Sequence, residues 1–183
     1  SNGTVINGEF DASQYEWYSC VAENTTVYSE PYVSHVNEVP IISLACPVYS
    51  DDDSATLLGI AGVDVKLSQV ADLMGSHKIG NTGYSILLSK KGEIAYAPKE
   101  EMILKTLEEI DADSKAVDAV KNQSVMTTKL KFDGGSKYGH FINVGTSGYM
   151  VLSMMPIMEF YQSTILCVAM VILLIAVACF IIF

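Results

Sequence analysis

The sequence predicts an α+β fold of antiparallel-sheet modules, followed by a C-terminal transmembrane helix. The first observation is the last segment, residues 163–183, which contains no charge, proline or glycine. A bilayer core about 30 Å thick needs roughly 20 apolar residues in a helix. A soluble helix of this length would show a polar face. The second observation is that paired apolar runs before this segment are joined by short polar or glycine-rich turns, which is typical of β-hairpins.

The first unit is expected over residues 1–76. Its apolar stretches IISLACPVY and TLLGIAGVDV flank the turn SDDDSA, and this arrangement predicts a hairpin. The acidic turn lacks the alternating ligand spacing of a calcium loop, so we interpret it as solvated. The predicted elements, in chain order, are a short capped helix (11–23), an extended segment (27–34), two strands (41–49 and 56–65) and an amphipathic helix (66–76).

The second unit is expected over residues 77–157, with glycine-rich turns such as DGGS and GTSG between its strands. The predicted elements are two strands (83–89 and 93–98), two helices (101–110 and 113–122) and three strands (123–132, 137–144 and 149–155). This order is PAS-like. Pro156 then opens the helix that runs through residues 158–183 into the membrane, at a first-turn position that proline tolerates.

The charge balance limits the partners of the chain. The formal net charge is −10, and all Lys, Asp and Glu residues precede Ser163. Such an acidic surface disfavours binding to nucleic acid. The chain contains no arginine, the residue that proteins favour for clamping carboxylates. Because Ser1 is not an initiator Met and Phe183 is still apolar, we expect further segments on both sides.

No motif points to catalysis, a metal or a cofactor. His35, His77 and His140 lack the spacing of a metal site or a catalytic triad. Cys20 and Cys46 can form a disulfide in an oxidising compartment, but without CxxC spacing buried free thiols are the simpler interpretation. We therefore expect a binding protein that is not an enzyme and has no cofactor.

Several segments, taken in order, resemble the double Cache family, the extracellular sensors of bacterial chemoreceptors, sensor kinases and cyclic-di-nucleotide enzymes. The matching segments are Trp17-Tyr18, SEPYVS, IISLACPVY, LLGIAGVDVKLSQVADL and TGYSILLSKKGEIAYAP. The later segment TSGYMVLSMMP resembles the closing strand of the family, with Tyr149 where tryptophan is common. The resemblance implies a membrane-distal ligand-binding module, incomplete at its start, and a membrane-proximal relay module.

The resemblance also implies a ligand pocket in the distal module. Trp17 and Tyr18 match the Trp-Tyr pair of the family's amino-acid-binding motif. Tyr32 matches its Pro-Tyr tyrosine, and Asp64 matches its late aspartate. We expect these four residues to bind the ligand.

Two positions depart from the motif. Tyr15 stands where the family has the arginine that holds the ligand carboxylate, and Ser34 stands where it has an aspartate.

Asp64 ends an apolar strand, where a carboxylate needs a partner, and an ammonium group would serve as that partner. The aromatic residues could add cation–π attraction. This favours an amine or an amino-acid-like ligand. Alternatively, Asp64 caps the following helix.

The resemblance implies an extracytoplasmic sensor of a membrane receptor, most often a chemotaxis transducer, that signals through the C-terminal helix. The full-length protein is then expected to be a homodimer that binds a small molecule. The alternatives are the sensor of a histidine kinase or diguanylate cyclase, or a non-sensing scaffold like the channel-accessory subunits. The replacements at Tyr15 and Ser34 favour the scaffold somewhat.

Overall fold

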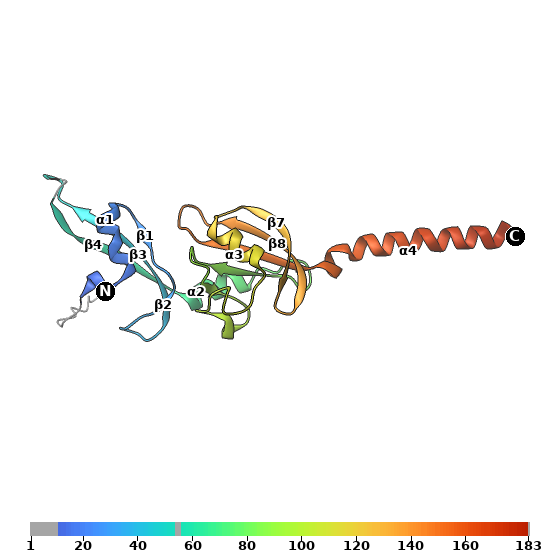
Figure 1. Ribbon diagram of the computed structural model, residues 1–183, viewed down its shortest axis with the longest axis horizontal. Helices are drawn as coiled ribbons and strands as arrows, with labels where there is room; N and C mark the ends of the chain where they lie inside the picture. Colours follow the sequence, from blue (N-terminus) through green and yellow to red (C-terminus); the bar gives the residue numbers. More distant parts are fainter. Residues whose placement is uncertain (1–10, 54–55, 183) are drawn as a thin grey trace.

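The computed structural model describes residues 11–53 and 56–182, and it contains two antiparallel sheets followed by one long helix (Figure 1). The two sheets lie side by side along the long axis of the molecule. The helix α4, Ile157–Ile182, extends away from both of them. The expected α+β class, with antiparallel modules and a long apolar C-terminal helix, is confirmed.

The first sheet is built around strand β3, Pro40–Tyr49, to which its other strands are hydrogen-bonded. Strand β4, Leu57–Lys66, pairs with β3 along its whole length, and this pair is the predicted hairpin. The short strands β1, Val27–Tyr28, and β2, Tyr32–Val33, pair with two different parts of β3. They therefore share its other edge.

The segment before this sheet differs from the single helix predicted over residues 11–23. It forms three short turns: η1, Ala12–Gln14; η2, Glu16–Ser19; and α1, Cys20–Glu23. Asp11 caps η1, because its carboxylate accepts a hydrogen bond from the Ser13 N–H at 3.0 Å. Tyr15 interrupts the helix with an extended backbone (φ −98°, ψ 141°).

Cys20 is buried and Cys46 is exposed, and both are free thiols, so only Cys20 matches the expected burial.

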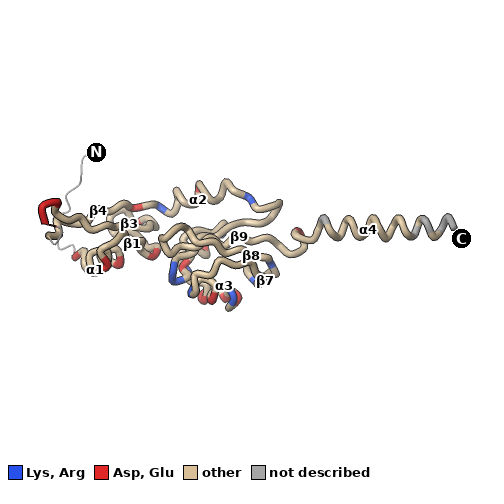
Figure 2. The backbone as a smooth tube through the Cα atoms, turned by 90° about the horizontal axis from the view of Figure 1, so that it is seen from above, with Lys and Arg blue, Asp and Glu red and all other residues tan. Residues whose placement is uncertain are grey.

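Helix α2, Leu67–Gly75, follows β4 without a connecting loop. The second sheet has the order β6-β5-β9-β8-β7. Its strands are β5, Tyr84–Leu88; β6, Ile94–Tyr96; β7, Met126–Phe132; β8, Gly135–Asn143; and β9, Met150–Pro156. Helix α3, Ser114–Lys121, lies on one side of this sheet, and α2 lies on the other (Figure 2).

The prediction of a helix over residues 101–110 is wrong. Only the 3-10 turn η3, Glu100–Met102, forms there. Leu104 has a positive φ of 65°, which ends helical geometry. The backbones of Leu104 and Lys105 instead exchange hydrogen bonds with Ile94 of β6, both at 2.9 Å. Pairing with a strand therefore overrides the local helical pattern.

Helix α3 is held by its cap and its apolar face. The Asp113 carboxylate accepts hydrogen bonds from the Lys115 N–H at 3.1 Å and from the Lys131 N–H of β7 at 3.0 Å. The same face of the second sheet carries the main core of the molecule, to which α3 contributes Ala116, Ala119 and Val120.

A smaller apolar cluster, which we call the junction cluster, joins the two sheets. Its buried residues are Ile42, Leu67, Ala95 and Tyr149.

Helix α4 continues β9 directly, beginning one residue after Pro156. The span Ile157–Ile175 has a mean hydropathy of 1.9 and is long enough to cross a membrane, by length and composition. The first turn of α4 is tied to the second sheet, because Glu159 accepts a hydrogen bond from the Thr82 N–H at 3.1 Å and also contacts the Asn81 N–H. The helix is therefore coupled to the sheet at its base.

Strand β8 allows a direct test of the core assignment. Phe141 is 0% exposed, whereas its neighbour Ile142 points to the opposite face and is 45% exposed. We expect Phe141→Ala to lower the free energy of unfolding by about 3–5 kcal/mol, because it removes buried apolar surface and leaves a cavity. Ile142→Ala should cost less than about 1 kcal/mol. Urea unfolding followed by circular dichroism measures both, and equal losses would contradict the register of β8.

Candidate functional site

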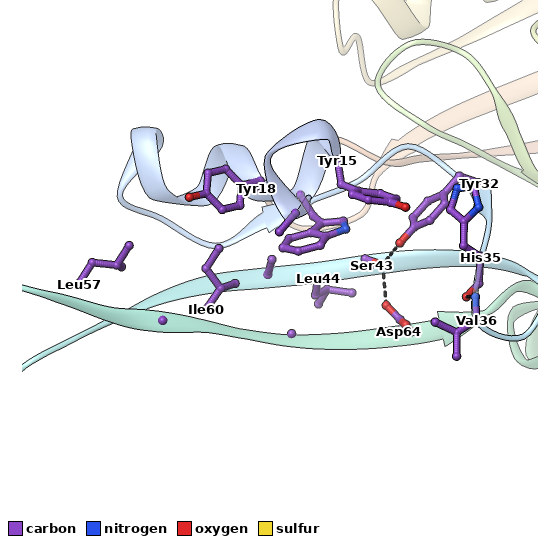
Figure 3. A pocket seen from close by; sticks show the side chains of 16 residues that line it. Tyr15, Tyr18, Tyr32, His35, Val36, Ser43, Leu44, Leu57, Ile60 and Asp64 are labelled. Atoms are coloured by element: carbon purple, nitrogen blue, oxygen red, sulfur yellow. Dashed lines mark hydrogen bonds between the residues drawn. The ribbon is translucent and has the colours of Figure 1, made fainter. Parts of the chain in front are cut away.

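A cavity of about 590 Å³ lies between the β3–β4 hairpin and the turns that precede the first sheet (Figure 3). It is lined by all four residues expected to bind ligand: Trp17, Tyr18, Tyr32 and Asp64. The two departing positions, Tyr15 and Ser34, line the same cavity. The structure therefore brings together the matched residues, from η2, β2 and β4, and the departing residues, which directly precede η2 and follow β2.

The pairing of β3 with β4 places polar side chains along one wall of this cavity. Ser43 of β3 pairs directly with Asp64 of β4. The Ser43 hydroxyl donates a hydrogen bond to the Asp64 carboxylate at 2.6 Å. Since that uses the serine proton, the Tyr32 hydroxyl is the donor in its 2.8 Å contact with Ser43 Oγ. Figure 3 shows this row of three side chains, which points the Asp64 carboxylate along one wall.

Aromatic rings form the opposite wall. Tyr15 and Trp17 stack, with ring centroids 5.8 Å apart and an interplanar angle of 23°. The ring centroids of Tyr32 and Tyr15 are 6.3 Å apart, and those of Tyr18 and Trp17 are also 6.3 Å apart. The extended backbone at Tyr15 makes this possible, because a continuous helix would direct these neighbouring rings to different sides. The wall presents several aromatic ring faces close to one another.

Asp64 dominates the electrostatics of the cavity. Among the described residues that line it, Asp64 is the only carboxylate, and none is a lysine. Burial raises the pKa of Tyr32, and the negative charge of Asp64 raises it further. One negative charge faced by aromatic rings is an arrangement that suits a cation, through charge and through cation–π attraction.

The alternative role of Asp64, as a cap of the following helix, is not what the structure shows. The residue at the N-cap of α2 is Lys66, and no side chain makes a capping hydrogen bond there. The Asp64 carboxylate is instead hydrogen-bonded across the hairpin to Ser43. Its position therefore serves the cavity and the pairing of β3 with β4.

Two polar residues of this cavity, His35 and Ser43, were not predicted from the sequence. The His35 ring lies edge-on to the Tyr15 ring, with ring centroids 5.8 Å apart. No spacing pattern marks it, because the turn between β2 and β3 brings it there. Ser43 was also missed, although a single polar residue inside the apolar run IISLA was a usable signal.

Comparison with known proteins identifies the family. The profile of the Cache domain matches residues 1–164, and the chain therefore belongs to the Cache domain family. Among curated proteins, it is 29% identical over 103 residues to the methyl-accepting chemotaxis protein PscA of Pseudomonas syringae pv. tomato, covering 55% of this chain and 16% of that protein. It is 24% identical over 106 residues to the methyl-accepting chemotaxis protein PctB of Pseudomonas aeruginosa, covering 57% and 16%. The chain thus spans only a small part of these relatives.

Solved structures share the fold. The ligand-binding domain of PctB from Pseudomonas aeruginosa matches with a TM-score of 0.66 and 17% identity, covering 87% of this chain and 67% of that one. The ligand-binding domain of Mlp24 matches with a TM-score of 0.61 and 22% identity, covering 85% and 61%. The extracellular domain of mmHK1S-Z3, a protein assigned as a histidine kinase, matches with a TM-score of 0.70 and 24% identity, covering 89% and 61%.

The contact between Tyr32 and Asp64 through Ser43 predicts a titration effect. Asp64→Asn removes a negative charge that disfavours the tyrosinate, so the pKa of Tyr32 should fall toward its ordinary value of 10.0. Asp72→Asn, at an exposed position of α2, should leave it unchanged. Ring carbon signals of labelled tyrosine, with Tyr32→Phe for assignment, follow the titration by NMR. An identical Tyr32 pKa in Asp64→Asn would contradict the geometry of the cavity.

Proposed function

We propose that this chain is the extracytoplasmic ligand-sensing region of a transmembrane signalling receptor, of the chemotaxis-transducer class. In this proposal, the cavity around Asp64 binds a small molecule that carries an ammonium group, and Trp17, Tyr18, Tyr32 and Asp64 contact it. The observation that carries it is the single carboxylate that faces an aromatic wall in that cavity. The proposed division is a distal module over residues 1–76, a proximal module over 77–157 and the membrane helix over 158–183.

The names of the relatives support the receptor class. The curated relatives are methyl-accepting chemotaxis proteins. Of the related structures, the PctB domain is in complex with L-Arg, the Mlp24 domain is with asparagine, and the PctC domain is in complex with GABA. Each of these ligands has an amino group, which fits a pocket with one carboxylate. As a sensor, the chain would have no catalytic role.

The departing residues shape the expected ligand. The chain contains no arginine, so no guanidinium of this chain can hold a ligand carboxylate. Where the resemblance implies an arginine and an aspartate, the cavity has the hydroxyl groups of Tyr15 and Ser34. We therefore favour an amine, or an amino acid whose carboxylate is bound by hydroxyl and backbone groups.

Signalling would pass from this cavity to the membrane helix through one serine. The Ser43 N–H donates to the Ser29 hydroxyl at 2.9 Å, and the Ser29 N–H donates to the Ser43 carbonyl at the same distance. The Tyr149 hydroxyl then donates to the Ser29 carbonyl at 2.7 Å. Tyr149 directly precedes β9, which leads into α4. A ligand that binds one arrangement of Ser43 better than another would thus bias the position of α4.

A histidine-kinase or diguanylate-cyclase sensor is the second candidate, supported by the similar fold of the mmHK1S-Z3 extracellular domain. The same pocket and the same link to α4 would serve such outputs equally. A scaffold with a vestigial pocket fits less well, because Tyr32, Ser43 and Asp64 form a continuous row of hydrogen bonds inside an open cavity. A homodimer of the full-length protein, with the sensing region outside the cytoplasmic membrane, completes the proposal.

The test is ligand binding by the full-length protein and its Asp64→Ala variant. Amines and amino acids would be screened by thermal shift, and hits would be titrated by calorimetry. A hydrogen bond to a charged group contributes about 1.5–3 kcal/mol. Asp64→Ala should therefore raise the dissociation constant roughly 10- to 150-fold. Asp72→Ala serves as the matched control and should bind normally. A hit that binds Asp64→Ala as tightly as wild type would show that the cavity is not the site.

A further inference from the structure

Three aromatic side chains meet at the base of α4, where this helix begins beside β8 and β9 (Figure 1). The ring centroid of Tyr138 in β8 lies 4.9 Å from that of Phe160 and 6.1 Å from that of Tyr161, and both of these residues belong to α4. The rings of Phe160 and Tyr161 meet edge-on, with centroids 5.3 Å apart. We call these three residues the base cluster. They tie α4 to the second sheet at a point other than the contact of Glu159 with Thr82.

The base cluster is largely open to solvent. Phe160 is 56% exposed and Tyr161 is 40% exposed, and the neighbouring Met158 is 72% exposed. Tyr138 is half-buried. Apolar surface that is contiguous and exposed in this way is typical of a surface that binds another molecule or a membrane.

The length of α4 would place the base cluster at the edge of a bilayer. From Ser163 to Ile182 the helix carries no charge, and at 1.5 Å per residue this part spans about 30 Å, the thickness of a bilayer core. Phe160 and Tyr161 would then lie about 3–5 Å outside the core, in the headgroup layer. Glu159, the only charged residue of α4, would also lie outside the core. Tyrosine is enriched at this depth, because its ring is apolar and its hydroxyl can reach polar groups.

Polar groups suited to phosphate lie next to the base cluster. The hydroxyl groups of Tyr138 and Tyr161 are 2.8 Å apart, so one donates to the other and the second proton remains available among the described residues. Lys129 of β7 pairs directly with Tyr138, and Lys131, two residues further along β7, is on the same face of the sheet. Both lysines are exposed, and neither forms a salt bridge within the described part of the chain.

We infer that the base cluster, together with Lys129 and Lys131, is a lipid-binding surface that docks the end of the second sheet on phospholipid headgroups. The aromatic rings would enter the headgroup layer beside α4, and the two lysines would approach the lipid phosphates. The inference rests on the proposed crossing of the membrane by α4. It goes further, because it assigns a membrane contact to the sheet itself.

Charge and position favour lipid over another protein as the partner of this surface. The surface is continuous with the apolar helix α4, since two of its rings belong to that helix. The chain has a formal net charge of −10, so most of its faces would be repelled by phosphate groups. The face beside the base cluster carries two unpaired lysines instead. Docking would set the depth of α4, so a ligand-driven shift of α4 would have to work against the attraction to lipid.

The test places the photocrosslinker p-benzoylphenylalanine, one position at a time, in the full-length protein in nanodiscs of phosphatidylcholine and phosphatidylglycerol. Ser136 is exposed, near Tyr138 on the same face of β8, and should give a lipid adduct. Ile142 is exposed on that face about 20 Å further from the base of α4, and it should give none. Leu166 of α4 should give a lipid adduct if α4 is in the membrane. Mass spectrometry identifies and counts the adducts.

A second set of variants tests whether the base cluster holds the sheet on the lipid. Tyr138→Ala should lower the lipid adduct at position 136 at least about twofold, because it removes the ring contacts with α4. His140→Ala, at the next exposed position on that face of β8, should leave the adduct unchanged. The melting temperature shows whether Tyr138→Ala is folded. If it is not, Lys129→Gln replaces it and should also lower the adduct at least about twofold.

The outcomes separate this inference from the proposed function. A lipid adduct at 166 but not at 136 would overturn the docking surface and leave the membrane helix intact. No lipid adduct at 166 would overturn the membrane placement of α4, and the inference with it. Equal lipid adducts at 136 and 142, an unchanged adduct in the folded cluster variant, or an adduct at 136 with a protein chain in place of lipid would each overturn the docking surface alone.

Discussion

The buried hydrogen bonds of Ser29 connect the cavity around Asp64 to the second sheet. Ser29 is 2% exposed and is bonded to the backbone of Ser43 on one side and to the Tyr149 hydroxyl on the other. In a buried position such bonds cannot be exchanged for bonds to water, so breaking one leaves a polar group unsatisfied. The junction cluster around Tyr149 excludes water from the same place. A shift of Ser43 in the first sheet would therefore also move Tyr149 beside the second sheet.

This arrangement supports the proposed role of the chain in signalling across a membrane. The cavity lies on the β3–β4 hairpin, the hairpin continues directly into α2, and β9 continues directly into α4. Glu159 then fastens the base of α4 to the loop at Thr82. A ligand with a few kcal/mol of differential affinity for two arrangements would suffice to shift their populations.

Much of the fold follows from sequence patterns, while the links between its parts do not. The apolar run after Ser163 and the hairpin over 41–65 are local signals, and both predicted correct elements. The helix predicted over residues 101–110 did not form, because the backbone of this segment pairs instead with Ile94 of β6. A family resemblance predicted Trp17, Tyr18, Tyr32 and Asp64 as site residues, and the structure places all four around one cavity. The bridging role of Ser29 was invisible, because it depends on Tyr149, 120 residues away.

The most direct test of this account is amide hydrogen exchange at Ser43 in the full-length protein carrying Tyr149→Phe. The variant removes a single hydroxyl from the second sheet, and the measurement is made in the first. A buried hydrogen bond contributes about 1 kcal/mol, so the Ser43 amide should exchange roughly fivefold faster. Tyr28→Phe, in the same cluster, should leave that rate unchanged. An unchanged Ser43 rate in Tyr149→Phe would show that the two sheets are not coupled through Ser29.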